Sequence, residues 1–357
     1  MQHPYTALPA RAYWRSGVAE TDRDGIAGLY VPKFPITRST AIATAGSCFA
    51  QHIGLHLRHA GCHVLDAEPA PDAMPENVAR AFGYGVYSAR YGNIYTARQL
   101  LDLLREVTLG TPDPRFVWEA AGRFHDAFRL SVEPHGLDSM AEVLQLRRHH
   151  LRRIAGLLAQ TELLIFTLGL TETWADRLTG RVFPVCPGVK AGTFDPEQHQ
   201  LLNLTHAQNL TDLADCLALL KGFNPNMKLL LTVSPVPLTA TASGDHVLTA
   251  TSWSKSTLRG VAGEFSTHPD VDYMPSYELI THPGAQPQNG GHWFAPNLRS
   301  VSQAGVARVM RVFLSAHGLD PQAKFATPAK ASALAEPEDG LVCDDILLDT
   351  FGTDAAQ

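Results

Sequence analysis

The chain has 357 residues, of which 45% are hydrophobic and 18% are charged, and its formal net charge is −6 at pH 7. This size and composition suit one large globular domain with a sizeable core. The acidic balance lacks the electropositive footprint of a nucleic-acid-binding protein. No stretch approaches the roughly 18 consecutive apolar residues of a membrane span, so we expect no membrane-spanning segment.

The five cysteines are scattered and odd in number, which argues against a disulfide framework. Residues 1–18 contain arginines but no apolar segment of the kind that a secretory signal needs. We therefore expect a cytoplasmic protein, and no sequence pattern calls for a cofactor. The sequence leaves the oligomeric state open.

Composition divides the chain into three parts. Prolines interrupt residues 1–40, so this segment is predicted to be irregular. Residues 320–357 are rich in Ala, Pro and Asp and are predicted to be a flexible tail outside the core. Between them, residues 41–319 are predicted to form one α/β domain.

Short apolar runs predict the strands of that domain. They cover residues 40–45, 161–168 and 227–233, with a weaker one at 271–274. Each run ends at a glycine, at Ser-Pro or at a proline, which is typical of strands buried on both faces of a parallel sheet.

Helical periodicity separates these runs and predicts helices over residues 49–60, 140–158, 210–220 and 302–314. Alternating strands and helices indicate a three-layer α/β fold with a doubly wound parallel sheet. Residues 67–128, which hold a Tyr- and Gly-rich stretch and a helical pattern from Thr96, do not fit the alternation. We predict that they form an inserted cap over the sheet edge.

Ligands of doubly wound sheets bind at the carboxyl ends of the strands, so the residues after each strand are the candidates for function. Ser47 stands where the first strand turns into a helix. Free N–H groups at a helix start stabilise an oxyanion, and a serine there can act as a nucleophile. The alternative is that Ser47 only caps the helix, because Ser is a preferred N-cap residue.

The residues around Ser47 carry a family resemblance. Gly46-Ser47-Cys48-Phe49-Ala50 resembles the signature of the GSCFA family, which looks like a branch of the SGNH hydrolase superfamily. Further similar blocks span residues 91–100, 166–174, 234–237, 254–255 and 275–278. The resemblance covers roughly residues 4 to 315 and implies an SGNH-hydrolase-like fold.

The resemblance also implies roles for individual residues. Ser47 matches the nucleophile, and Gly92 or Asn93 takes an oxyanion role. Gly169-Leu170-Thr171-Glu172 lines up with the Gly-x-Asn-Asp block of the superfamily, so Thr171 replaces the oxyanion asparagine. The residues expected to bind the oxyanion or substrate are therefore Cys48, Gly92, Asn93, Gly169, Thr171, Glu172 and Trp174.

Two of these residues have competing interpretations. Cys48 is either a second nucleophile at the helix start, where the pKa of a thiol falls, or a small buried packing residue. Trp174 either lines a substrate pocket or belongs to the core.

The expected general base is missing. Asn297 and Ser300 stand where the superfamily has Asp-x-x-His, and neither can act as the carboxylate or the imidazole. His292 follows a Gly-rich approach to the last helix, and His246 lies in the loop after the third strand. Either histidine is a candidate base, and the alternative for each is a loop histidine in solvent.

Two other sets of residues have candidate roles. A stripe of histidines at helical spacing could bind zinc: His52, His56, His59 and His63. Because no acidic or thiolate partner accompanies the stripe, we expect a partly solvated helix face and predict no metal site. Arg98, Lys255 and Arg299 could hold an anionic or sugar-phosphate substrate or form surface ion pairs.

These observations predict a serine esterase or O-acyltransferase of SGNH type that acts on an acylated carbohydrate or a related hydroxylated metabolite. The expected partner is a small-molecule or carbohydrate substrate. The carbohydrate part rests on family analogy. The alternative is a non-catalytic binding or scaffold protein that keeps the fold and has a degenerate triad.

Overall fold

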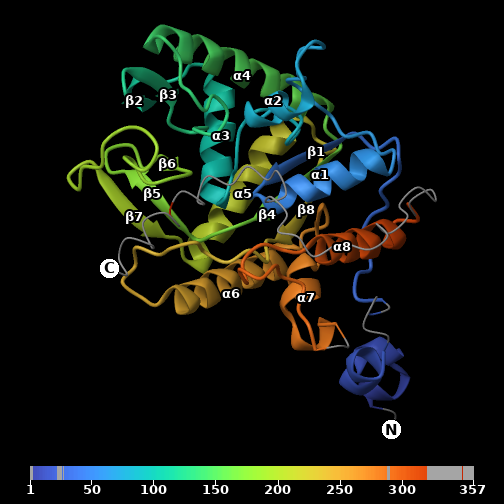
Figure 1. The fold of residues 1–357 in the computed structure, drawn as a ribbon. Coiled ribbons are helices and arrows are strands. Elements are labelled where there is room, and N and C mark those ends of the chain that lie inside the picture. The colour runs from blue at the N-terminus through green and yellow to red at the C-terminus, as the bar shows by residue number, and fades with distance from the viewer. Residues whose placement is uncertain (1–2, 22–25, 27, 288–289, 320–347, 349–357) are drawn as a thin grey trace.

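The computed structural model describes residues 3–21, 26, 28–287, 290–319 and 348 (Figure 1). The predicted flexible tail, residues 320–357, therefore lies outside the described residues apart from Leu348. Where the structure describes residues 1–40, their helices are short: the 3-10 helices η1 (Pro4–Ala7) and η2 (Ala10–Ala12) and the π-helix η3 (Arg15–Ala19).

Four parallel strands form the central sheet, in the order β1-β4-β8-β9. They are β1 (Ile42–Gly46), β4 (Leu163–Leu168), β8 (Lys228–Val233) and β9 (Val271–Tyr273). The four strands predicted from apolar runs are thus confirmed, and the α/β fold class with them. Their buried positions run continuously, as expected for strands covered on both faces.

The chain order reverses at β1. After β1 and the helix that follows it, Val64 forms a parallel bridge with Ile42 on the edge of β1 that β4 does not occupy. The backbone confirms this pairing, because the N–H of Leu65 donates to the carbonyl of Ile42 at 2.8 Å. This isolated bridge adds chain to the outer edge of β1, so the chain order turns at β1 as it does in doubly wound sheets.

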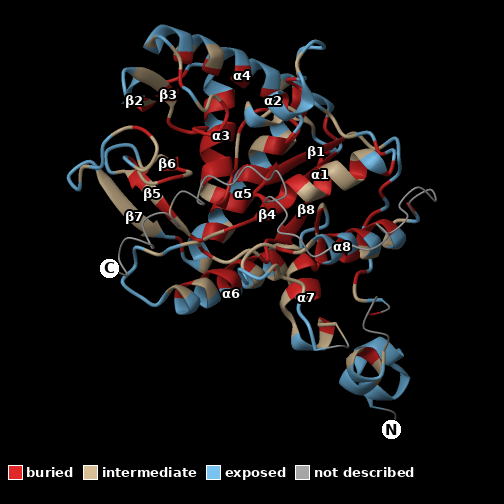
Figure 2. Ribbon diagram, viewed as in Figure 1, coloured by how far each residue is buried: buried red, intermediate tan, exposed pale blue. Residues whose placement is uncertain are grey.

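Alternate strand residues face two separate apolar clusters. Leu164, Phe166 and Leu168 of β4 belong to one cluster, whereas Leu163 and Ile165 belong to the other. The first cluster is covered by α3 (Ala97–Leu109), α4 (Met140–Gln160), α5 (His206–Phe223) and α6 (Val247–Phe265). The second is covered by α1 (Phe49–His59), α7 (Ser276–Thr281) and α8 (Gln303–Ala316). The sheet is consequently the buried middle layer between two layers of helices (Figure 2).

Smaller elements connect the helices and strands of the three layers. The sequence did not predict several of them. These are helix α2 (Glu76–Ala81), the 3-10 helices η4 (Pro114–Phe116) and η5 (Pro283–Ala285), and the antiparallel hairpin of β2 (Val117–Ala120) and β3 (Arg123–Asp126). Nor did the sequence predict a second, antiparallel sheet of order β6-β5-β7, made of Val182–Phe183, Glu172–Asp176 and His199–Asn203.

The segment 67–128 contributes more than a cap. Its helix α3 packs against α4 and α5, and four of its leucines lie in the main apolar cluster. Helix α6 was not predicted either, and it places His246 at its N-cap position rather than within a long loop.

In the described part of the chain, no helix combines the length and apolar composition that a membrane crossing requires.

The backbone conformation and close packing at the end of β1 require a glycine at position 46. Gly46 has φ of +139°, and a Cβ atom there would lie 2.6 Å from the carbonyl oxygen of Thr167. We expect Gly46→Ala to lower the free energy of unfolding by about 3 kcal/mol, from backbone strain together with the clash.

Gly110→Ala is the matched control, since Gly110 also has a positive φ, +68°, but nothing lies within 4 Å of its added Cβ. It should cost only the strain, about 1 kcal/mol. Urea unfolding of both variants measures the difference, and equal losses would show that the close approach of β1 to β4 is not constrained in this way.

Candidate functional site

The carboxyl ends of β1, β4 and β8 lie side by side at one edge of the central sheet. Ser47 follows β1, Gly169 follows β4 and Ser234 follows β8. The N–H of Ser234 donates to the carbonyl of Leu168 at 2.8 Å, which joins the last two of these ends. Because the chain order reverses at β1, the boundary between β1 and β4 is where such sheets bind their ligands.

Ser47 is almost completely buried there, with 3% of its surface exposed. Its N–H donates to the carbonyl of Thr167 at 3.3 Å, and its own carbonyl accepts from the hydroxyl of Tyr87 at 3.1 Å. Its side-chain Oγ has no hydrogen-bond partner among the described residues. The N-cap position of α1 falls on Cys48, and no side chain caps the helix, so Ser47 does not serve as a cap.

Gly169 lies in close contact with Ser47. A Cβ atom at Gly169 would lie 2.9 Å from Cβ of Ser47 and 3.1 Å from the carbonyl oxygen of Tyr95. That carbonyl accepts two N–H groups, from Gly169 at 2.8 Å and from Leu170 at 3.0 Å. A glycine is therefore required where the end of β4 meets the Ser47 turn.

Lys255 reaches this strand end from α6. Its Nζ donates to the carbonyl of Gly169 at 2.6 Å, and only 1% of the residue is exposed. Of the two roles considered for Lys255 in the sequence, a surface ion pair is excluded by this burial. Arg98 instead pairs with Asp212 at 2.8 Å.

Asn93 lies in the segment that crosses the end of β1. The N–H of the next residue, Ile94, donates to the carbonyl of Gly46 at 2.9 Å. Asn93 is buried, and its Oδ1 accepts from the hydroxyl of Tyr87 at 2.6 Å and from Gln51 at 3.3 Å. Gly92, with φ of +71°, supplies the turn before it. Asn93 thus meets the serine turn through Tyr87, which bonds to both.

Gln99 fixes the same segment from the first turn of α3. Its Nε2 donates to the carbonyl of Asn93 at 2.8 Å, and its Oε1 accepts the N–H of Tyr95 at 2.9 Å. Thr96 caps α3 by accepting the N–H of Gln99. No individual role was predicted from the sequence for Tyr87, Tyr95 or Gln99. The contacts of Tyr87 with Ser47 and of Tyr95 with Gly169 join residues that are distant in the chain, whereas Gln99 bonds locally to Asn93 and Tyr95.

Thr171 is occupied within the protein. Its N–H donates to Oγ of Ser254 at 3.0 Å, and its hydroxyl donates to Oδ1 of Asn203 at 2.7 Å. Thr171, which was predicted to replace the asparagine of the oxyanion hole, therefore links the start of β5 to β7 and α6.

Glu172 and Trp174, both predicted site residues, line one cavity of about 260 Å³. Tyr95 and Leu170 also line it, so the cavity begins next to Gly169. Its other walls are mostly apolar. Burial raises the pKa of Glu172, whose carboxylate accepts the hydroxyl of Thr241 at 2.8 Å.

The two candidate bases lie on the surface. His246 Nδ1 accepts the N–H of Leu248 at 3.2 Å, and His292 Nδ1 accepts the N–H of Phe294 at 3.3 Å. Both residues are exposed. Neither imidazole hydrogen-bonds Ser47 Oγ, since that atom has no partner among the described residues.

The remaining candidates have local structural contacts. Cys48 is a buried free thiol, and the N–H groups of Cys48 and Phe49 open α1 without an acceptor in the described part of the chain. In the histidine stripe, the His56 ring bonds to the carbonyl of His52 at 2.9 Å, and burial lowers the pKa of His56. Within the described ranges, no three His, Cys, Asp or Glu side chains are grouped as metal ligands.

These features define an α/β protein whose polar strand-end residues gather at the reversal point of a parallel sheet. The GSCFA family model matches residues 41–313, which is more than half of the chain, and the chain belongs to the GSCFA family. A search of curated proteins finds no match.

The unpartnered hydroxyl of Ser47 leads to a stability prediction. Because a buried hydroxyl without a partner costs free energy, Ser47→Ala should keep the free energy of unfolding or raise it by up to about 1 kcal/mol. Ser139→Ala is the control, since Ser139 caps α4 by accepting the N–H of Glu142 at 3.2 Å. That variant should lose about 1 kcal/mol. Chemical denaturation compares them, and a similar loss in both variants would mean that Ser47 supports α1 after all.

Proposed function

We propose that this GSCFA protein is a serine acyl-ester enzyme of SGNH type, a hydrolase or an O-acyltransferase, with Ser47 as its nucleophile. One observation carries the proposal: the hydroxyl of Ser47 is buried at the β1–β4 boundary and has no hydrogen-bond partner among the described residues. Unsatisfied buried polar groups are costly and rare, and they gather at functional sites. A substrate would supply the missing interaction.

The chemistry follows from the residues around Ser47. Oγ attacks the ester carbonyl carbon while its proton passes to a base, and the alcohol leaves with a proton as the acyl–oxygen bond breaks. Water, or the hydroxyl of an acceptor, then releases the acyl group from Ser47. No cofactor is needed for either step.

The developing oxyanion requires hydrogen-bond donors. The N–H groups of Ser47 and Gly169 already donate to protein carbonyls. The N–H groups of Cys48 and Phe49 are the donors that the start of α1 leaves open, and they lie at the positive end of the helix dipole. We assign the oxyanion role to these two groups, and the buried ammonium of Lys255 bonds to the carbonyl of the neighbouring Gly169.

The apolar cavity beside Gly169 suits the organic part of the substrate. Its aromatic and aliphatic walls favour an acyl chain or the apolar face of a sugar ring, and Glu172 supplies a hydroxyl acceptor. An acylated carbohydrate or a similar hydroxylated metabolite meets both requirements. We also propose a cytoplasmic location, which suits the free thiols of Cys48, Cys62, Cys186 and Cys216.

The histidines favour a second candidate function. His246 and His292 are exposed, and each is bonded within its own turn. A protein that binds a small molecule at the same strand ends, without turnover, needs no base. This non-catalytic role is the alternative that the following experiments separate from catalysis.

Covalent labelling tests the nucleophile. A fluorophosphonate probe should label the wild-type protein and Ser139→Ala, whereas Ser47→Ala should take up none, because the probe reacts with an activated serine hydroxyl. Mass spectrometry of the tryptic peptides locates the adduct. A wild-type protein that stays unlabelled, while folded and monodisperse, supports the binding function instead.

Separate His246→Ala and His292→Ala variants test the base. If catalysis uses one of these imidazoles, that variant should lose activity on a chromogenic ester by about 100-fold or more, while the other stays near wild type. Each variant serves as the control for the other, because both histidines are exposed and only cap local turns. Full activity in both variants would remove His246 and His292 from the mechanism.

A further inference from the structure

A second cavity, of about 250 Å³, lies between α4 and the segments 67–69 and 84–90. It shares no lining residue with the apolar cavity beside Gly169. Its lining is dominated by charge: Glu68, Arg90, Arg129, His149 and Arg153 all border it. We call it the arginine cavity.

Arg90 is fixed at this cavity, with 7% of the residue exposed. Its guanidinium carbon lies 3.8 Å from the ring centroid of Tyr84, which is cation–π stacking distance. Nε donates to the carbonyl of Phe82 at 3.0 Å, and Nη2 donates to Glu133 at 2.6 Å. The planar group therefore holds one orientation before any ligand arrives.

Arg129 is held equally firmly and is 6% exposed. Its Nε donates to Asp126 at 2.7 Å, and its Nη1 donates to the carbonyl of Arg90 at 3.3 Å. Asp126 is shared with Arg147, whose Nη1 donates to it at 3.3 Å. The carboxylate thus engages one side of the Arg129 guanidinium.

The side chains of Arg90, Arg129 and Arg153 have N–H donors that their described contacts do not use. Arg153 donates from Nε to the carbonyl of Ala67. In the described part of the chain, no acceptor is found for Nη1 of Arg90, Nη2 of Arg129 or either Nη of Arg153. Guanidinium groups in fixed positions with spare N–H donors are the preferred partners of phosphate and carboxylate oxygens.

Glu68 sets a further condition on the ligand. Its carboxylate accepts the backbone N–H of Arg90 at 2.7 Å and Nδ1–H of His150 at 2.7 Å. Burial lowers the pKa of His150 to about 4, so this imidazole is neutral at pH 7. The carboxylate stays ionised and borders the cavity, where it repels a fully ionised anion but can accept a hydrogen bond from one that carries a proton.

We propose that the arginine cavity binds a protonated phosphate group, with Arg90, Arg129 and Arg153 as donors to its oxygens and Glu68 as acceptor of its P–OH. Phosphate near pH 7 retains a proton, whereas sulfate does not. The cavity therefore distinguishes two tetrahedral anions of similar size. The proposal is independent of catalysis at Ser47, because it concerns other residues and equilibrium binding only.

Isothermal titration of the full chain at pH 7 and constant ionic strength tests this site with inorganic phosphate as the probe. Phosphate should bind saturably, and sulfate should bind about ten-fold more weakly or not at all. Arg153→Gln should weaken phosphate binding by about ten-fold, since it removes charged donors at the exposed rim.

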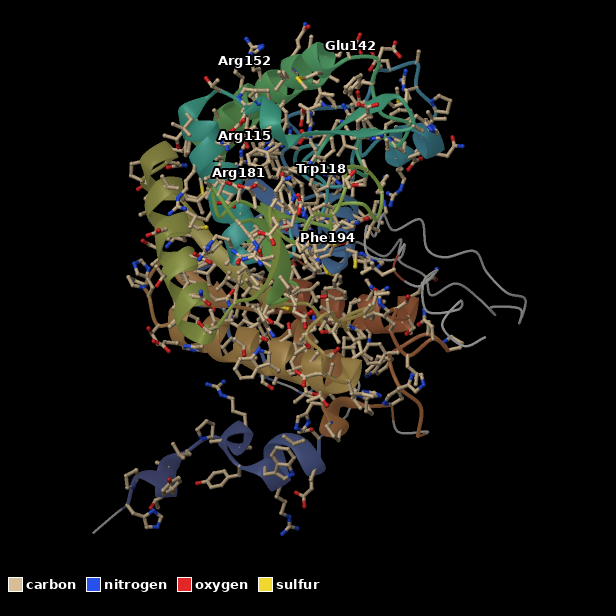
Figure 3. All side chains as sticks on the ribbon, turned by 90° about the vertical axis from the view of Figure 1, so that its left-hand side faces the viewer. Arg115, Trp118, Glu142, Arg152, Arg181 and Phe194 are labelled. Atoms are coloured by element: carbon tan, nitrogen blue, oxygen red, sulfur yellow. The ribbon has the colours of Figure 1, made fainter. Side chains whose placement is uncertain are left out.

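Arg152→Gln is the matched control. Arg152 is the neighbouring exposed residue of α4, it does not border the cavity, and its side chain points outward (Figure 3). It makes the same change of charge and should leave phosphate affinity unchanged. Competition by glycerol phosphate distinguishes a site for a phosphomonoester from a site for the free anion, and either result supports the proposal. No saturable phosphate binding, equal effects of the two arginine variants, or equal affinity for sulfate overturns it.

Discussion

The close approach of two neighbouring strand ends governs the architecture of this protein. Gly46 ends β1 with its Cα against the backbone of Thr167, and Gly169 follows β4 with its Cα against Ser47. A methyl group at either position would overlap atoms of the other strand or its turn. The missing side chains let the Ser47 turn lie directly over the end of β4, and so they create the buried environment of the serine hydroxyl.

A single connecting segment stabilises that arrangement. Residues 87–99 cross the end of β1. Within them, Tyr87 bonds to Ser47 and Asn93, and the side chain of Gln99 bonds to the carbonyl of Asn93 and the N–H of Tyr95. The same segment begins near the arginine cavity, where Arg90 bonds to Glu68 through its backbone. One stretch of chain therefore borders both the serine turn and the arginine cavity.

The sequence predicted the central sheet well, because its strands are short apolar runs with clear ends. It also predicted the position of Ser47 after the first strand. It did not predict β5, β6 and β7, since β5 and β7 are partly exposed and carry no continuous apolar run, and β6 has only two residues. Helix α6 was not predicted because its sequence contains many Ser, Thr and Gly residues, which are weaker helix formers than Ala or Leu.

The parts of the site that escaped prediction depend on distant pairings. Lys255 is a basic residue with no local sign of burial, and only the packing of α6 brings its ammonium to Gly169. The arginine cavity joins side chains from residues 68 to 153, which no sequence window contains.

The pairing of β1 with β4 has a consequence for how the chain folds. Ile42 pairs with Leu163, so the two strands are separated by about 120 residues of chain. The central contact of the sheet is therefore nonlocal, and long-range pairing of this kind slows folding because loop entropy is lost before the contact is gained. The turn at Ser47 and Gly169 acquire their mutual geometry only when β1 and β4 have paired across this long stretch of chain. The serine turn is thus expected to be among the last features to form during folding.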